Sequence, residues 1–241
     1  MMNLGKKLGF AALLAFGTAG AVNASTIVLD TFDYTPVVNL QVNQGTTQDS
    51  TTRFDVNSFL GDVEYTLDYI NGPASLDSAS VSFDYFGDGV MSYSNDDFMV
   101  SSLTMLYSAF DGTPASALDL TQGGSFSAFY FDILSSDLGF TIDVTVGSAA
   151  GANTSNYMSA SSSVSTYQRE LIDFSNFSTV AGTGADFTAV DFVNIILTTT
   201  SVGSDLTITE FGIASVPEPT TLAIFGLALV GFAFNSKRKA Q

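Results

Sequence analysis

Phe140-Thr141-Ile142-Asp143-Val144-Thr145-Val146 is the stretch that decides the fold, because apolar and polar residues alternate along it without a break. A period of two places successive side chains on opposite faces of a β-strand, with one face buried and the other in solvent. The same alternation occurs in residues 63–69 and 81–85. Thr, Ser, Val, Phe and Tyr, the residue types that strands prefer, dominate these segments. The stretch therefore predicts one strand of an all-β domain.

Further strand-like segments follow at short intervals. They are residues 98–107, 128–134, 192–198 and 206–213. Turn signals such as Gly87-Asp88-Gly89 separate the segments, and no amphipathic helix lies among them. Many short strands at this spacing are typical of a sandwich. We therefore expect a single antiparallel β-sandwich over residues 25–215.

Two polar stretches are expected to lie outside the main strands. Residues 41–52 contain Gly45-Thr46-Thr47 and are predicted to be irregular. Residues 149–165 are rich in Ser, Ala and Asn. We interpret them as a loop that leads into a strand.

The chain between its two ends is strongly acidic. Of 7 Lys and Arg in the whole chain, only Arg53 and Arg169 lie there, with 23 of the 24 acidic residues, so this body has a formal net charge of −21. Such a charge excludes nucleic-acid binding through a basic footprint and disfavours docking on anionic lipid. It favours solubility, divalent cations and cationic partners.

The chain has no Cys, no His and no Trp. Without disulfides, an exported fold depends on burial or on bound metal. Ser-His and Cys-His nucleophilic catalysis are excluded, and the usual ligands of a zinc site are missing. These absences argue against an enzyme.

The N-terminal end has the three parts of a secretory signal peptide. Lys6 and Lys7 form a short basic region, residues 8–22 are apolar, and Val22-Asn23-Ala24 supplies small residues for cleavage. We predict a signal peptide over residues 1–24, exported by the Sec machinery. Signal peptidase would cut between Ala24 and Ser25.

The C-terminal end also has three parts. Val216-Pro217-Glu218-Pro219 comes first, the uncharged segment 222–234 follows, and Lys237, Arg238 and Lys239 close the chain. A helix over 219–234 would be about 24 Å long at 1.5 Å per residue, short for a bilayer core but tolerated by local thinning. The three basic residues predict a cytoplasmic stop for a transmembrane helix.

This end resembles the PEP-CTERM sorting signal of Gram-negative bacteria, over residues 216–241. The resemblance implies processing by an exosortase near Pro217-Glu218-Pro219. The body would be anchored in the inner membrane before processing, and would then reach the cell surface or the extracellular matrix.

The two ends of the body carry a second, pattern-level resemblance, to galactose-binding-like jelly rolls. Residues 27–33 open the body, and 191–197 and 206–213 close it, as in domains whose first and last strands pair. The resemblance implies a jelly-roll-like sandwich and carbohydrate binding. The missing Trp departs from such modules, which usually stack sugars on Trp.

Acidic residues beside one turn suggest a calcium site. Asp84, Asp88, Asp96 and Asp97 could supply oxygen ligands to Ca²⁺, which takes six to eight of them. A solvated acidic turn explains the same residues, since Asp also favours turn geometry. We therefore expect either a solvated acidic turn or a structural calcium site at these residues.

Aromatic and acidic residues offer two further kinds of site. Six tyrosines could form a sugar-stacking platform, although most aromatic residues of a sandwich fill its core; they are Tyr34, Tyr69, Tyr85, Tyr93, Tyr130 and Tyr157. A glycoside hydrolase needs two carboxyl groups across a cleft. The body's only Glu residues, Glu64, Glu170 and Glu210, lie in strand-like patterns where an outward charge is expected.

The sequence therefore predicts an exported surface or extracellular-matrix protein with a structural or adhesive role. The alternative is a carbohydrate-binding jelly-roll module that acts on exopolysaccharide. A hydrolase is the third and weakest interpretation.

Overall fold

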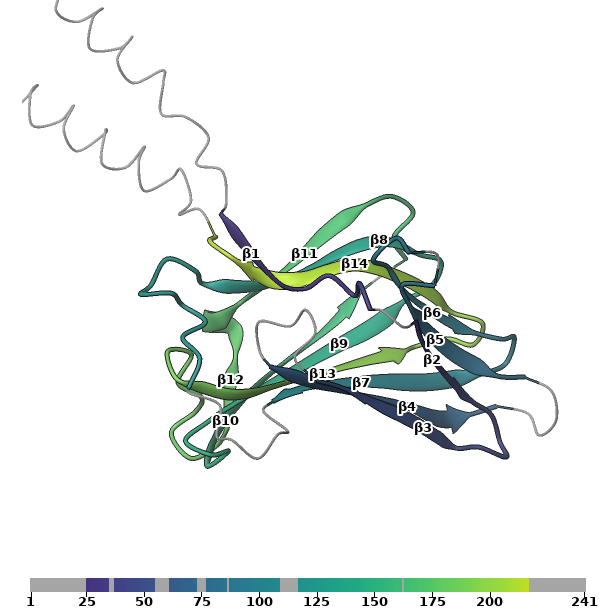
Figure 1. The fold of residues 1–241 in the computed structure, drawn as a ribbon, viewed down its shortest axis with the longest axis horizontal. Coiled ribbons are helices and arrows are strands. Elements are labelled where there is room, and N and C mark those ends of the chain that lie inside the picture. The colour runs from purple at the N-terminus through teal and green to yellow at the C-terminus, as the bar shows by residue number, and fades with distance from the viewer. Residues whose placement is uncertain are drawn as a thin grey trace, which may run out of the picture. The chain divides into compact units, whose positions relative to one another are not determined.

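The computed structural model describes residues 25–34, 37–54, 61–72, 77–85, 87–108, 117–161 and 163–216. Two antiparallel seven-stranded sheets pack face to face in this part of the chain (Figure 1). The sandwich spans Thr26–Ser215. The predicted all-β, antiparallel sandwich is confirmed.

Sheet A has the strand order β11-β8-β14-β6-β5-β2, and β1 also pairs with β14. Its strands are β1 (Thr26–Asp30), β2 (Val38–Val42), β5 (Ala79–Phe83), β6 (Met91–Asn95), β8 (Ala128–Ser136), β11 (Gln168–Asp173) and β14 (Asp205–Ala214).

Sheet B has the strand order β12-β10-β9-β13-β7-β4-β3. Its strands are β3 (Gln48–Arg53), β4 (Asp62–Asn71), β7 (Val100–Ser108), β9 (Phe140–Ser148), β10 (Asn153–Ser161), β12 (Ser178–Ala181) and β13 (Val190–Thr199). A short 3-10 helix, η1 (Phe174–Asn176), connects β11 of sheet A with β12 of sheet B.

Along β9, burial alternates in step with the apolar and polar residues that predicted the strand. Phe140, Ile142, Val144 and Val146 are buried, and the residues between them are partly exposed. Ile142, Val144 and Val146 lie opposite Leu197, Ile195 and Val193 of β13, which are buried as well. Because paired residues share a face, these rows pack inward and form the sheet B side of the core.

The two polar stretches are more regular than predicted. The irregular interpretation of residues 41–52 is wrong, since β2 and β3 cover most of them and a turn from Asn43 to Thr46 joins the two strands. Residues 149–165 hold the nine-residue β10, which pairs with β9 along its whole length. Polar side chains suit these strands because their outer faces meet solvent, and the pairing comes from the backbone.

The first and last strands of the sandwich pair, as the jelly-roll resemblance implied. Strand β1 lies against β14 from Thr26 opposite Ala214 to Asp30 opposite Phe211. Strand β6 pairs with the other half of the same β14 edge, at residues 205–208. Residues Thr209 and Glu210 therefore lie in the interval between β1 and β6, next to irregularities in the β14–β8 pairing.

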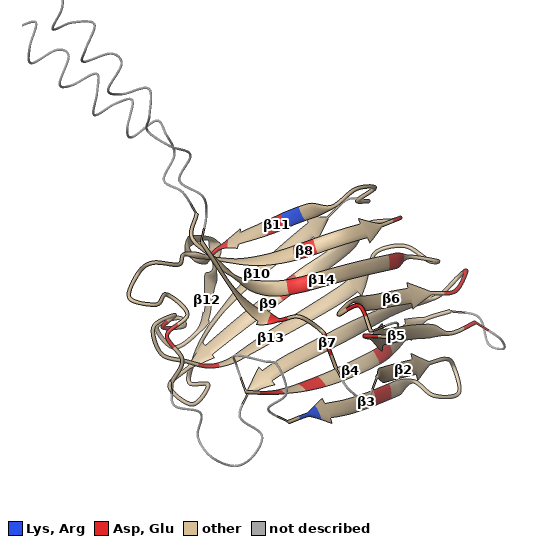
Figure 2. Cartoon of the chain, turned by 45° about the horizontal axis from the view of Figure 1, so that its top comes forward, with Lys and Arg blue, Asp and Glu red and all other residues tan. Residues whose placement is uncertain are grey.

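Residues 1–24 and 217–241 lie outside the described residues, and with them the predicted signal peptide, the transmembrane helix 219–234 and the basic end. Across the described residues, no helix combines the length and hydrophobicity that a membrane crossing requires. Figure 2 shows acidic residues on many strands of the sandwich, whereas basic residues occur only on β11 and at the end of β3.

Candidate functional site

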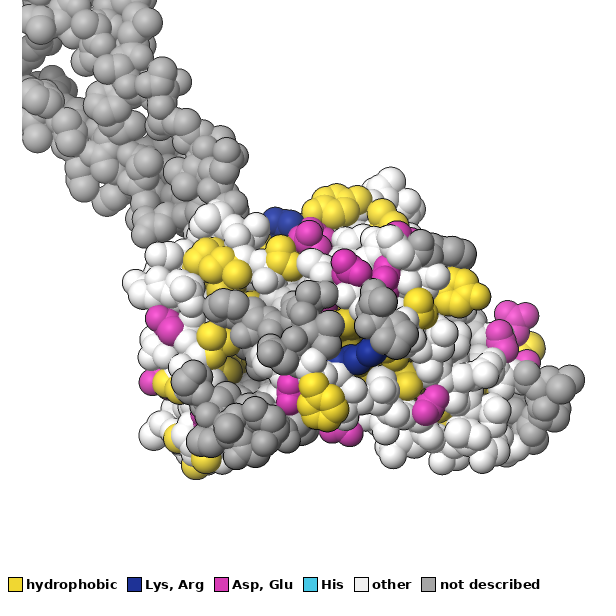
Figure 3. Space-filling model, in the orientation of Figure 1, with side chains coloured by type: hydrophobic (Ala, Val, Ile, Leu, Met, Phe, Trp, Pro, Cys, Tyr) yellow, Lys and Arg dark blue, Asp and Glu magenta, His cyan; other side chains and the backbone are white. Residues whose placement is uncertain are grey.

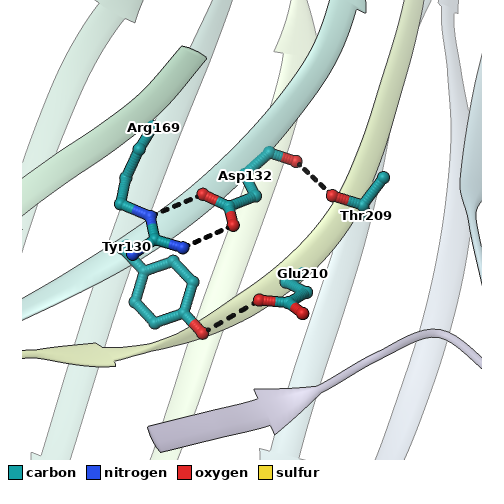
Figure 4. A network of polar contacts seen from close by, with 5 residues as sticks. All are labelled: Tyr130, Asp132, Arg169, Thr209 and Glu210. Atoms are coloured by element: carbon teal, nitrogen blue, oxygen red, sulfur yellow. Dashed lines mark hydrogen bonds and ion pairs between the residues drawn. The ribbon is translucent and has the colours of Figure 1, made fainter. Parts of the chain in front are cut away.

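A network of polar side chains lies on the outward face of sheet A. Asp132 of β8 stands opposite Arg169 of β11 and Glu210 of β14. Tyr130 lies two residues before Asp132 on the same face, because side chains alternate along a strand. Figure 4 shows these side chains turned toward one another across the three strands.

An ion pair with two hydrogen bonds is the centre of this network. Arg169 donates through Nε to Oδ1 of Asp132 at 2.6 Å and through Nη2 to Oδ2 at 2.6 Å. Asp132 is buried, with 5% of its surface exposed. Hydrogen bonding to Asp132 raises the pKa of Arg169 above its usual value. Planar, two-point pairing of this kind is the strong form of a salt bridge.

The ring of Tyr130 packs against the Arg169 guanidinium group, and its hydroxyl links the pair to Glu210. The Arg169 guanidinium carbon lies 4.2 Å from the centre of the Tyr130 ring, and the Tyr130 hydroxyl donates to Oε2 of Glu210 at 3.2 Å. The ring is fully buried. It fits because Gly212 has no side chain: a Cβ atom there would lie 2.5 Å from the ring. Burial, then the charge of Glu210, raises the pKa of the Tyr130 hydroxyl.

Tyr167 adds an accessible aromatic ring to the network. Its surface is 56% exposed. Partial burial, followed by its hydrogen bond with Asp132, raises the pKa of its hydroxyl. An exposed ring beside Arg169 and Asp132 offers an apolar face next to charged hydrogen-bonding groups.

A polar pocket of about 430 Å³ adjoins the network and shares Glu210 with it. It lies where β14 runs between β1 and β6. Its lining residues are Thr31, Asp33, Gly87, Asp88, Gly89, Thr209 and Glu210. Three carboxylates and two hydroxyl groups can accept hydrogen bonds from a ligand or attract a positive charge.

The structure does not bring together the four residues of the predicted calcium site. Asp84 and Asp88 lie in the β5–β6 turn, whereas Asp96 and Asp97 follow the far end of β6. Asp84 accepts from the Gly89 backbone N–H, and Asp96 accepts from the backbone and hydroxyl of Ser78. The four carboxylates therefore do not fit one ion. No group of three acidic side chains arranged to hold a metal is found in the described part of the chain.

The six tyrosines do not form a platform. Tyr34, Tyr93 and Tyr130 are buried, and Tyr69 and Tyr157 are partly buried against the core. Only Tyr85 is largely exposed, at 59%. The preferred interpretation, that these rings fill the sandwich, is confirmed for Tyr34 and Tyr93, which belong to the core, whereas Tyr130 is buried on the outward face of sheet A.

The three glutamates are separated. Glu64 lies on β4 of sheet B, and Glu170 and Glu210 lie on sheet A. Glu170 stands opposite Phe131, on the inward-facing rows, whereas Glu210 stands opposite Asp132 on the outer face. They do not face one another across a cleft.

Sequence reasoning missed the Asp132–Arg169 pair. Two signals could have indicated it: Arg169 is one of two cations in the body, and Asp132 interrupts an otherwise apolar strand. A charge in such a strand needs a partner when it is buried. The sequence does not say which of the two arginines supplies it.

On one face of the molecule the acidic side chains are scattered rather than gathered (Figure 3). The face presents apolar groups in small separate patches. Charge alone therefore marks no site on it, and the candidate site is defined by the network and the pocket.

Comparison with known proteins identifies the C-terminal segment. Residues 215–239 match the PEP-CTERM protein-sorting motif. No curated protein matches the chain.

Several solved structures are similar to the sandwich. The family 11 carbohydrate-binding module of cellulosomal cellulase Lic26A-Cel5E of Clostridium thermocellum is 14% identical, with 80% of this chain and 97% of that chain covered and a TM-score of 0.38. The family 30 carbohydrate-binding module of cellulase Cel9D-Cel44B of the same organism is 10% identical, with 82% and 100% covered and a TM-score of 0.40.

The motif implies export, sorting to the cell surface and processing by an exosortase. It begins at Ser215, directly after the last strand of the sandwich ends at Ala214. The chain is thus an antiparallel two-sheet β-sandwich followed by a PEP-CTERM protein-sorting motif.

Proposed function

We propose that the sandwich is the exported part of a surface or extracellular-matrix protein with a structural or adhesive role. The observation that carries this proposal is the position of the sorting motif, which starts one residue after β14 ends. Every strand of the sandwich precedes the motif. Cleavage near Pro217-Glu218-Pro219 would therefore release a complete domain.

The proposed route has three steps. The Sec machinery exports the chain, and signal peptidase cuts between Ala24 and Ser25. The apolar segment 219–234 then holds the chain in the inner membrane, with Lys237, Arg238 and Lys239 in the cytoplasm. An exosortase finally cuts near the Pro-Glu-Pro sequence, and the body moves to the surface or the matrix.

Mass spectrometry of surface material tests this route. We expect a C-terminus near Pro217-Glu218-Pro219 and no peptide containing Lys239. Replacing both Pro217 and Pro219 with Ala should trap the full chain in the membrane fraction, because it removes both prolines of the sorting motif and the restriction that each places on φ. A Pro114→Ala variant is the control. Surface protein that still ends at Gln241 would refute the route.

We propose carbohydrate binding as a second candidate function. It is favoured by one observation: the exposed Tyr167 ring adjoins the Arg169–Asp132 pair, and Asp132 lies opposite Glu210, which lines the pocket. A sugar ring can stack on an aromatic face while its hydroxyl groups bond to charged side chains. The charge of the body disfavours anionic polysaccharides, so a neutral or amine-bearing exopolysaccharide suits this site.

Affinity electrophoresis through gels that contain neutral, amine-bearing or anionic polysaccharides tests this candidate. We expect neutral or amine-bearing gels to retard the protein and Tyr167→Ala to remove most of the retardation. The matched control is Phe98→Ala, which removes another exposed ring, 65% accessible, from the β6–β7 turn. Equal losses in both variants, or retardation by none of the gels, would refute binding at this face without affecting the sorting route.

A further inference from the structure

Asp30 is a carboxylate buried between the two sheets. It ends β1 of sheet A and has no exposed surface. Its Oδ1 accepts the backbone N–H of Phe32 at 2.7 Å. Its Oδ2 lies within hydrogen-bond distance of three tyrosine hydroxyl groups, from Tyr34 at 2.6 Å, Tyr65 at 3.0 Å and Tyr107 at 2.8 Å.

These tyrosines connect β1 with the opposite sheet. Tyr65 belongs to β4 and Tyr107 to β7, both of sheet B, and Tyr34 follows β1. All three are buried, with at most 1% of their surface exposed. The carboxyl group of Asp30 therefore fastens the N-terminal strand across the core.

A count of protons shows which form of Asp30 suits this cluster. The cluster consists of Oδ2 of Asp30 and the three tyrosine hydroxyl oxygens. These four oxygen atoms make four contacts: each hydroxyl contacts Oδ2, and the hydroxyls of Tyr34 and Tyr65 contact each other. With Asp30 ionised, three tyrosine protons serve four contacts, so one pair of oxygens has no hydrogen between them. A fourth proton, on Asp30, completes every contact. Asp30 can donate to Tyr34, Tyr34 to Tyr65, and both Tyr65 and Tyr107 to Asp30.

The charges around Asp30 support the same form. The groups that face it are the hydroxyls of the three tyrosines and Phe211, which lies opposite Asp30 on β14, and the Phe83 ring packs on the rings of Tyr34 and Tyr65. The nearest basic group of the cluster is Arg53, whose guanidinium carbon lies 5.6 Å from the centre of the Tyr34 ring. Burial raises the pKa of Asp30, although the hydrogen bonds from Tyr34, Phe32, Tyr107 and Tyr65 oppose the rise. Ionisation of a carboxyl group in such a buried site costs the hydration that stabilises its charge.

We propose that Asp30 is uncharged in the folded sandwich. Its hydrogen bonds with the three tyrosines, here called the Asp30 clasp, hold β1 to sheet B and weaken as the pH rises. A group whose pKa is higher in the folded than in the unfolded protein stabilises the fold fully below its unfolded pKa. That contribution is lost as the pH rises through the folded pKa. An exported protein meets the pH of its surroundings, so the clasp makes the attachment of its first strand respond to that pH.

Thermal melts of the full-length chain from pH 4 to pH 9 test the clasp, with Asp30→Asn as the variant. Asn cannot titrate, so its melting temperature should rise relative to the wild type as the pH rises. The relative change should be about 3 to 5 °C for each pH unit between the pKa values of Asp30 in the unfolded and folded protein. Asp205→Asn, which neutralises an exposed carboxylate on β14, is the control for the general effect of charge and should show no such trend.

Two outcomes of the melts would overturn the proposal. A difference between Asp30→Asn and the wild type that does not change with pH would mean that Asp30 does not titrate in this range. A relative loss of stability in the variant as the pH rises would mean that the hydrogen bonds keep Asp30 ionised. Infrared spectroscopy of wild-type protein labelled at Asp needs no folded variant: a carboxylic-acid band at neutral pH supports the clasp, and its absence refutes it.

Discussion

Removing Arg169 tests the geometry of the candidate site directly. The Arg169→Ala variant leaves Asp132 with its carboxylate largely buried and without the two 2.6 Å hydrogen bonds that neutralise it. It also uncovers the Tyr130 ring, which the guanidinium group now covers at 4.2 Å. We therefore expect lower stability rather than a change of fold.

The expected loss follows from the exposure of the two partners. Removing one partner of a fully buried ion pair costs about 3–5 kcal/mol, and an exposed pair contributes at most about 1 kcal/mol. The Arg169 side chain is 33% exposed and that of Asp132 only 6%, so this pair lies between these limits. We expect a loss of about 2 kcal/mol in the free energy of unfolding. For a domain of this size the melting temperature should fall by about 4–8 °C.

Urea unfolding followed by tyrosine circular dichroism measures this loss, since the chain has no Trp. The midpoint should fall and the slope should stay constant if only stability changes. The matched controls are Arg169→Lys, which keeps the charge but not the two-point geometry, and the double variant Arg169→Met with Asp132→Asn. Lys should recover about half of the loss. The double variant should recover most of it, because no buried charge remains. A loss below about 0.5 kcal/mol in Arg169→Ala, or a double variant no more stable than the single one, would refute the reasoning.

Three further predictions concern the core, the processed N-terminus and calcium. Gly212→Ala should lower the free energy of unfolding by about 2–3 kcal/mol, the loss that overpacking causes. The added Cβ atom would lie 2.4 Å from the Ile27 carbonyl oxygen and against the Tyr130 ring. Gly45→Ala lies in an exposed turn, where its Cβ would meet only the Asn43 side-chain oxygen at 3.2 Å, so it should change the free energy of unfolding by less than about 0.5 kcal/mol. Equal melting temperatures of the two variants would contradict the packing argument. N-terminal sequencing of the exported protein should begin at Ser25, and retention of Met1 would disprove cleavage. Because the predicted calcium ligands lie at two ends of one hairpin, melts with EDTA and with Ca²⁺ should coincide; calcium-dependent stabilisation would show that other oxygens form a site.

The strands with strict alternation could be predicted from the sequence because their period is a local property. The β9 pattern and its inward row are an example. The strands β3 and β10 could not be recognised as readily. Their polar residues meet solvent or pair with polar neighbours, so they carry little hydrophobic period, and the adjacent strands supply their hydrogen bonds.

The candidate site could be predicted only in its parts. Asp88 is the one member of the proposed calcium set that lines the pocket, where it joins Asp33 and Glu210 rather than Asp96. The turn that made the four acidic residues look close is followed by a five-residue strand, β6, that carries two of them away. Nearness along the chain therefore did not become nearness in space.

The sequence by itself determined the class of the fold, the acidity of the body and the sorting motif, because period, charge and a short linear signal are properties of consecutive residues. Only the tertiary structure decided which residues meet. Arg169 and Asp132 are 37 residues apart in the chain, Tyr130 and Glu210 are 80 apart, and Tyr107 and Asp30 are 77 apart. The register of β8 with β11 and β14, and the packing of the two sheets, bring these pairs together. Strand register and sheet packing depend on the whole chain at once.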